Sequence, residues 1–260
     1  MKKFGIIPFI IFIFIHTFTV QAQITLDGTC GVSGVLEGPD FKIEAGMGKE
    51  YGNNLFHSFG KFNINTGETA IFYGPESVTN IITRVTGGSQ SWIDGSLKSD
   101  IAGANLFLLN PSGIMFGPNA SLDISGSFHM NTAEYLRFED GVKFDAVYPQ
   151  NNLLTLAAPT AFGFLKENPA HIAVKGDIKV QQCKAISLTA GNIDITGGTL
   201  EAQNGQINIT STGETAANGN IIINKGSVFA DGGQISISGT SSGKEIPLAY
   251  ADNMAFEGYG

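Results

Sequence analysis

Short apolar runs recur at a nearly fixed spacing through the last third of this 260-residue chain. They fall into groups of three, with steps of 6 to 8 residues inside each group. The second group begins 21 residues after the first, and the third begins 28 after the second because a polar insert lengthens one connection. The nine runs begin at Ile172, Ile178, Ile186, Ile193, Leu200, Ile207, Ile221, Val228 and Ile235. Three strands per turn of about 21 residues predict an all-β fold, a right-handed three-sided parallel β-helix.

Two smaller repeats agree with this register. Gly176, Gly198 and Gly226 each lie two residues before the middle strand of a group, and the segment Gln206–Ile209 matches the segment Gln234–Ile237. One coil cannot bury its inward Ile, Leu and Val side chains alone. Stacking at the strand spacing of about 4.8 Å places like residues over one another in a continuous core.

The segment 105–130 has the same rhythm, since its apolar pairs begin eight residues apart. The pairs are Leu106/Leu108, Ile114/Phe116 and Leu122/Ile124. The connection Asn110-Pro111-Ser112-Gly113 has the residues of a type I turn, because proline fixes φ at the second position and glycine suits the fourth. We therefore predict three short strands separated by tight corners.

Residues 1–22 predict a cleaved secretory signal peptide. Lys2 and Lys3 precede an apolar run, and Val20-Gln21-Ala22 resembles a cleavage site. The alternative is a membrane anchor, but the run is near the short limit for spanning a bilayer and no positive charge follows it to stop transfer. We expect export from the cytoplasm and no stable membrane insertion after cleavage.

Charge and cysteine content exclude several other classes. The formal net charge is −8, and removal of residues 1–22 takes away two lysines and no acid. This acidity argues against nucleic acid or an anionic membrane as a partner. Cys30 and Cys183 lie too far apart to suggest a disulfide framework, and neither has a second metal ligand at the usual spacing. We expect no metal and no other cofactor.

Residues 23–64 are expected to cap the N-terminal end of the stack, which would otherwise expose an open strand edge and the core. They alternate strand candidates at 24–26, 41–43 and 54–64 with glycine-rich turns. The last candidate contains Asn54-Leu55-Phe56-His57-Ser58-Phe59, whose His-Ser pair suggests a nucleophile. Adjacent strand residues point to opposite faces, so we do not expect His57 to activate Ser58. No catalytic residue is assigned.

Between residues 131 and 169 the regular spacing stops. Charged residues gather there, among them Glu134, Arg137, Glu139, Asp140 and Asp145. Paired carboxylates cleave glycosides, but no carboxylates recur at matching positions on successive coils. We favour an excursion that forms its own hairpin, with these charges on a solvated face.

Three segments resemble the N-terminal secretion domain of filamentous-haemagglutinin-type exoproteins, also called the haemagglutination activity domain. They are Asn54 to Ile64 (NLFHSFGKFNI), Ile81 to Asp94 (IITRVTGGSQSWID) and Asn105 to Gly117 (NLFLLNPSGIMFG), and weaker matches extend the resemblance over 23–180. The family is exported by two-partner secretion (TPS). The resemblance implies that the POTRA domains of an outer-membrane TpsB transporter of the Omp85 type recognise this domain.

The resemblance also implies roles for two segments. Asn110, Pro111, Ser112 and Gly113 would form an export corner that contacts the transporter, and the segment 54–59 would support the N-terminal fold. The usual family tetrapeptide is Asn-Pro-Asn-Gly, so Ser112 removes an amide that could contact the transporter. The alternative is that the corner only shapes the β-helix and touches no partner.

The predicted domains are the signal peptide 1–22, the capped TPS domain 23–180, further β-helix coils 181–239 and a segment 240–260 that either caps the last coil or begins a longer continuation. We expect a secreted or cell-surface monomer that reaches the outside by Sec export and periplasmic transit in a Gram-negative-type cell. Its function would be a non-enzymatic secretion and scaffold domain of an adhesin- or haemagglutinin-like exoprotein, which nucleates β-helix folding outside the cell. A host-cell or surface ligand is a second class of partner.

The alternative function is an extracellular β-helix polysaccharide lyase or hydrolase. Such an enzyme would need Asp, Lys and Arg clustered on one coil face to bind calcium or to act as acid and base. The outward positions of the regular coils are mostly Asn, Ser, Thr and Gln. This composition favours the scaffold.

Overall fold

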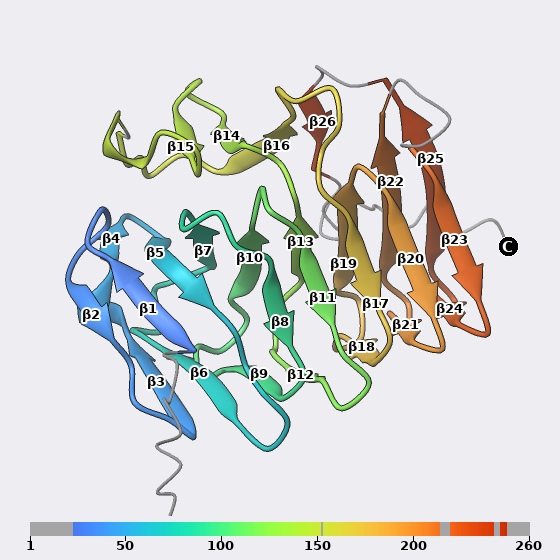
Figure 1. The fold of residues 1–260 in the computed structure, drawn as a ribbon, viewed down its shortest axis with the longest axis horizontal. Helices are drawn as coiled ribbons and strands as arrows, with labels where there is room; N and C mark the ends of the chain where they lie inside the picture. Colours follow the sequence, from blue (N-terminus) through green and yellow to red (C-terminus); the bar gives the residue numbers. More distant parts are fainter. Residues whose placement is uncertain (1–22, 152, 214–218, 242–244, 249–260) are drawn as a thin grey trace, which may run out of the picture.

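The chain forms a three-sided parallel β-helix whose coils run from the N-terminal to the C-terminal end (Figure 1). The computed structural model describes residues 23–151, 153–213, 219–241 and 245–248. The predicted signal peptide lies outside these residues, as does most of the segment 240–260. In the described ranges the only helices are two short 3-10 turns, η1 (Ala45–Met47) and η2 (Pro149–Asn151).

One face of the β-helix, face A, carries seven parallel strands, one per coil. They are β5 (Asn54–Phe62), β7 (Asn80–Val85), β10 (Asn105–Leu109), β13 (Phe128–Asn131), β19 (Ala185–Ala190), β22 (Gln206–Thr212) and β25 (Gln234–Thr240). The inward side chains on this face are mostly fully buried, and those of Leu106, Met130 and Ile186 are 0 to 1% exposed. Face A is therefore the longest continuous ladder of the fold.

The other two faces complete the coils. Face C consists of β8 (Ser91–Ile93), β11 (Ile114–Phe116), β17 (Ile172–Val174), β20 (Ile193–Thr196) and β23 (Ile221–Asn224). The third face begins with β3 (Asp40–Glu44), β6 (Thr69–Tyr73), β9 (Ser96–Ser99) and β12 (Ser121–Asp123), and continues with β18 (Asp177–Lys179), β21 (Thr199–Glu201) and β24 (Ser227–Phe229). The predicted corners of the segment 105–130 separate β10, β11 and β12 as expected.

The periodicity predicted the register residue by residue. On face C, Ile172 pairs with Ile193, and Ile193 pairs with Ile221. Ile178, Leu200 and Val228 are register partners on the third face, and Ile186, Ile207 and Ile235 are register partners on face A. The three-strand repeat is confirmed for these three coils. Burying one such aliphatic side chain contributes about 1.5 to 3 kcal/mol.

The repeated glycines mark a corner where successive coils approach closely. A Cβ atom added at Gly176 would lie 2.3 Å from the carbonyl oxygen of Gly117 in the coil below, and one at Gly198 would lie 2.6 Å from the oxygen of Gly176. The Gly176 oxygen accepts a hydrogen bond from the Thr199 amide of the next coil. Glycine is therefore required because a side chain would push the stacked backbones apart.

Three antiparallel strands cap the first coil. The first half of β5 pairs with β4 (Lys49–Tyr51), on the edge that faces away from β7. The second half of the same edge pairs with β1 (Ile24–Asp27). The strand β2 (Ser33–Val35) pairs with β1. The cap predicted for residues 23–64 is thus confined to β1, β2 and β4. The strands β3 and β5 belong to the coils, because they pair in parallel with β6 and β7.

The excursion leaves the fourth coil between β13 and β17 and forms a separate antiparallel sheet, sheet D. It contains β15 (Lys143–Asp145), β14 (Tyr135–Phe138), β16 (Pro159–Gly163) and β26 (Glu245–Pro247), in that order. The expected hairpin is β14 and β15. The strand β26 was not predicted and comes from the far end of the chain (Figure 1).

Sheet D covers the outer side of face A and creates a second core. Phe56, Ile82 and Phe107 point out from β5, β7 and β10 and meet Phe138, Phe144 and Phe162 of sheet D. The Phe56 ring lies 5.1 Å from the Phe144 ring and 5.8 Å from the Phe138 ring, between centroids. The first three coils are therefore packed on both sides of face A.

The two ends of the stack differ in exposure. At the capped end Ile24 and Leu26 are 0% and 6% exposed, whereas in the last coil the inward side chains of Ile235 and Ile237 are 46% and 51% exposed. Their register partners one coil earlier, Ile207 and Ile209, are fully buried. The inward side chains of β25 are therefore half-exposed apolar surface, unlike those of the preceding coils.

The glycine corner gives the first prediction. Gly176→Ala should lower the free energy of unfolding by about 1 to 3 kcal/mol, because the new methyl group meets a backbone oxygen that cannot move aside. Gly46→Ala is the matched control, since no heavy atom lies within 4 Å of its added Cβ. Urea titration of both purified variants tests this, and equal midpoints would contradict the close approach of the coils.

Candidate functional site

The predicted export corner is a hydrogen-bonded turn embedded in the stack. The Asn110 side chain is 0% exposed. Its Nδ2 atom donates to the Ser89 carbonyl oxygen at 3.0 Å and to Ser91 Oγ at 2.9 Å, both in the preceding coil. Its Oδ1 atom accepts from the Ser112 amide at 2.9 Å, and the Gly113 amide closes the turn on the Asn110 carbonyl at 3.0 Å. The Asn110 amide therefore holds the third coil on the second.

The other three corner residues differ in accessibility. Pro111 and Gly113 are buried and Ser112 is half-buried. Gly113 has φ +107°, and an added Cβ would lie 3.1 Å from the His171 carbonyl oxygen. The Ser112 hydroxyl makes no hydrogen bond within the described part of the chain. A contact between the corner and a transporter stays a prediction, and in the folded domain Ser112 is the residue best placed to make it.

The segment 54–59 lies on β5, between the two cores. Leu55, His57 and Phe59 point into the β-helix, while Phe56 points into the second core. The His57 ring lies 5.5 Å from Phe72, and its two nitrogens have no hydrogen-bond partner among the described residues. Ser58 is on the opposite side of the strand, where its hydroxyl hydrogen-bonds to other groups. The structure therefore gives this pair no nucleophile geometry, as expected from strand alternation.

Ser58 belongs to a buried network centred on Arg84 of β7, whose side chain is 0% exposed. Arg84 Nε donates to Ser58 Oγ at 2.7 Å, and Arg84 Nη2 donates to Thr29 Oγ1 of the cap at 2.8 Å. The guanidinium also donates to the carbonyl oxygens of Asp145 and Pro149 in the excursion, and lies 4.2 Å from the centroid of the Phe144 ring. One side chain thus joins the cap, the first two coils and sheet D.

Asp27 completes this network. Its carboxylate accepts from Ser58 Oγ at 2.7 Å, from Thr86 Oγ1 at 2.6 Å and from Thr29 Oγ1 at 2.8 Å. Burial raises the pKa of Asp27, but the hydrogen bonds from Thr86, Thr29 and Ser58 outweigh it and hold the pKa below its usual value. The network could not be predicted from the sequence, because nothing there indicates that Asp27 and Arg84 meet around Ser58 and Thr29.

An asparagine ladder runs through the starts of the first three face A strands. Asn54 Nδ2 donates to the carbonyl oxygens of Thr155 and Ala157, and Asn54 Oδ1 accepts from Asn80 Nδ2 at 2.9 Å. Asn80 Oδ1 in turn accepts from Asn105 Nδ2 at 3.1 Å. The sequence carried a signal for this ladder, since an asparagine begins each of β5, β7 and β10. The ladder fixes the register of these strands and anchors the excursion to the first coil.

Two acids of the excursion have hydrogen-bond partners within the excursion itself. Asp140 accepts from the Val142 amide and from the Thr155 hydroxyl, and Asp145 caps the amides of Val147 and Tyr148. These acids therefore hold turns in place.

Two other charges of the excursion also have structural partners. Arg137 pairs with Glu245 of β26. The expectation of a solvated face is wrong for Glu134, which is 2% exposed. Its Oε2 atom accepts from the Leu165 amide at 2.8 Å, and its Oε1 atom lies 3.6 Å from Lys166 Nζ. Glu134 is buried because the start and the end of the excursion meet there.

The described ranges show neither a metal-ligand cluster nor a membrane-spanning helix. No group of three or more His, Cys, Asp or Glu side chains is arranged there to hold a metal ion. Cys30 is buried and Cys183 is exposed, and both are free thiols. Burial raises the pKa of the Cys30 thiol to about 11. None of the helices in these ranges has the length and apolarity needed to span a bilayer.

The buried amide of Asn110 gives the second prediction. Asn110→Ala should lower the free energy of unfolding by about 1 to 3 kcal/mol, because it leaves the Ser112 amide and the Ser89 carbonyl without their partner. Ser112→Ala should change it by less than about 0.5 kcal/mol. Thermal unfolding of both variants measures the difference. A stable Asn110→Ala variant would show that this amide does not hold the coils together.

Two buried histidines give the third prediction. Burial lowers the pKa of His57 to about 4 and that of His129 to about 3, from 6.5. The unfolded chain therefore binds more protons than the folded chain below pH 6.5, so stability falls as the pH drops from 6.5 toward 4. Between pH 7 and pH 5 the loss should be roughly 1 to 2 kcal/mol per histidine.

Urea titration across this pH range measures the loss. His57→Phe should remove part of the pH dependence, because phenylalanine suits the aromatic surroundings of this position and binds no proton. An unchanged slope in this variant would show that His57 is not neutral in the folded chain.

Comparison with known proteins places the chain in a family. A family model described as the TPS secretion domain matches residues 22–255. The match includes the capped first coil, the Asn110 corner, sheet D and all seven face A strands, and so extends beyond Val180, where the resemblance in the sequence ended. A comparison with individual curated proteins gave no match. The chain therefore belongs to the TPS secretion domain family, the secretion domains of two-partner exoproteins.

Proposed function

We propose that this TPS domain is recognised in the periplasm by the POTRA domains of a TpsB-type outer-membrane transporter, and that it then nucleates β-helix folding outside the cell. It acts without catalysis, as the secretion and scaffold domain of an adhesin- or haemagglutinin-like exoprotein. Export begins through the Sec pathway, directed by residues 1–22. The folding part of the proposal rests on one observation: the first coil is capped and buried, whereas the last coil has half-exposed inward side chains.

The capped end has the features of a folding nucleus. The free edge of β5 is covered by β1 and β4, so the first coil exposes no unpaired ladder there. The Arg84 network and the second core tie this coil to sheet D. A first coil stabilised from both sides does not need a preceding coil as template.

The other end has the features of a template. Ile235 and Ile237 present half-exposed apolar surface in register with the coils below, and β25 is the last strand of face A. A following coil that places aliphatic side chains over them gains burial and ladder hydrogen bonds at once. Folding outside the membrane then proceeds in the order in which the chain emerges, and this direction draws the rest of the chain outward.

The Asn110 corner contributes to export in this proposal, and the segment 54–59 supports the folding nucleus. In the folded domain the Asn110 amide is buried, so it acts by fixing the turn, while Ser112 is half-buried. Before the third coil folds, the whole tetrapeptide is accessible to a transporter.

The test is secretion of the full chain from a Gram-negative host with and without its candidate transporter. Export should require the transporter, and Asn110→Ala should reduce the amount in the medium several-fold, whereas Ser112→Ala should be exported like the wild type if the fixed turn is what matters. Circular dichroism of the exported variants reports whether they fold. Equal secretion without the transporter would refute two-partner export of this chain.

A further inference from the structure

The outward side chains of face A that line the seam with sheet D change from apolar to polar along the β-helix. In the first three coils Phe56, Ile82 and Phe107 fill it as part of the second core. In the last three coils the corresponding outward residues are polar, and the seam opens into a groove with a volume of about 310 Å³. Pockets that take small ligands begin at about this volume.

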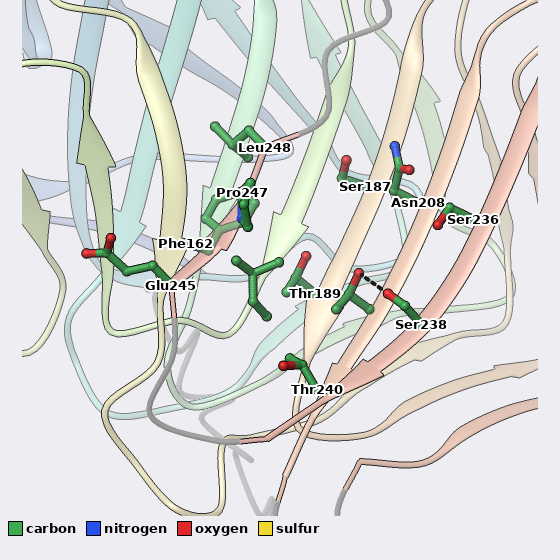
Figure 2. Close-up of a pocket in the computed structure, with 12 residues that line it drawn as sticks. Phe162, Ser187, Thr189, Asn208, Ser236, Ser238, Thr240, Glu245, Pro247 and Leu248 are labelled. Atoms are coloured by element: carbon green, nitrogen blue, oxygen red, sulfur yellow. Dashed lines mark hydrogen bonds between the residues drawn. The ribbon is translucent and has the colours of Figure 1, made fainter.

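The floor of this groove consists of two rows of polar side chains on β19, β22 and β25. The first row is Ser187, Asn208 and Ser236, and the second is Thr189, Thr210 and Ser238. Members of one row are register partners about 4.8 Å apart, and the rows are two residues apart along the strands. Figure 2 shows the labelled side chains of these rows, Ser187, Asn208, Ser236, Thr189 and Ser238, beside Pro247 and Leu248. We call this site the hydroxyl groove.

One polar atom of this floor is buried and has no protein partner within the described ranges, namely Nδ2 of Asn208. Ser187 and Thr189 are each 4% exposed as residues, and their hydroxyls face the groove and make no hydrogen bond to the described residues. Buried polar groups are normally hydrogen-bonded, and leaving one unpaired costs about 1 to 3 kcal/mol. Donors and acceptors without protein partners at the floor of an open groove are available to a ligand.

The opposite wall is apolar and carries no free charge. This wall is lined by Phe162 of β16 and by Ile246, Pro247 and Leu248 at β26 (Figure 2). The one charged residue among the described lining residues is Glu245, whose carboxylate is held by Tyr135 Oη at 2.9 Å and by Arg137. A charged ligand would lose its hydration in the groove without gaining a partner of opposite charge.

We propose that the hydroxyl groove binds an uncharged oligosaccharide. Serine and threonine hydroxyls both donate and accept hydrogen bonds, as sugar hydroxyls do, so two rows of them match a ligand with several hydroxyls. The C–H face of a sugar ring packs against the apolar wall formed by β26. Thr210 Oγ1 and Ser238 Oγ hydrogen-bond to each other at 3.2 Å, but a purely apolar ligand would leave the Asn208 amide and the Ser187 and Thr189 hydroxyls unpaired, which disfavours it. The site is separate from the Asn110 corner, and its role does not depend on transport.

The wild-type test titrates the full isotope-labelled chain with a panel of neutral oligosaccharides of two to six residues, built from glucose, galactose, mannose or N-acetylglucosamine. Tetragalacturonate is the charged comparison. At least one neutral probe should bind saturably and shift the backbone amide signals of β19, β22, β25 and β26. The proposal is overturned if no neutral probe binds, if the shifts lie elsewhere, or if tetragalacturonate binds in the groove as tightly.

Paired variants test the rows directly. The double variant Ser187→Ala/Thr189→Val removes two hydroxyls from the groove and should weaken binding of that probe at least about tenfold. The matched control is Thr199→Val/Ser227→Ala, which removes the same groups from a register pair on the outer side of β21 and β24. It should bind like the wild type. Amide spectra confirm that both variants are folded, and equal affinities of the two would overturn the proposal.

Discussion

Every coil of this domain depends on the coil beside it, because three strands of three to nine residues cannot bury their own inward side chains. Stacking in register solves this problem, as shown by the ladder from Ile186 to Ile207 to Ile235. The same requirement explains the glycines at the close corner, where Gly198 meets the carbonyl oxygen of Gly176. It also explains the buried amide of Asn110, which satisfies groups of the coil below. A stack of this kind is stable only if at least one of its ends is closed.

Closure at the N-terminal end is built from several weak elements that support one another. The strands β1 and β4 pair with the edge of β5, the asparagine ladder fixes the register, and Arg84 connects the cap with sheet D. A fully buried guanidinium is costly unless hydrogen bonds satisfy it. Here Ser58, Thr29 and two carbonyl oxygens do so, which makes the position of the excursion specific. The residues that tie the excursion to the first coil thus also stabilise the capped end.

Much of the β-helix could be predicted because periodicity records stacking directly, and nine residues chosen from the sequence are register partners. The contacts between distant segments could not be predicted. The three residues of β26 are too short to give a pattern, yet they pair with β16 more than 80 positions earlier. Arg84 reads as an ordinary charge in a strand, and only the fold brings Thr29 and Asp145 to it. The turn at Asn110 was recognisable from its residues, but the burial of its amide depends on where the preceding coil lies.

The central claim is that the capped end is the stable seed on which later coils assemble. Native-state hydrogen exchange of the full chain tests it, because face A offers amides in each of the seven coils. We expect the slowest exchange in β5, β7 and β10, and progressively faster exchange toward β25. Uniform protection along face A, or the slowest exchange in β22 and β25, would contradict a nucleus at the N-terminal end.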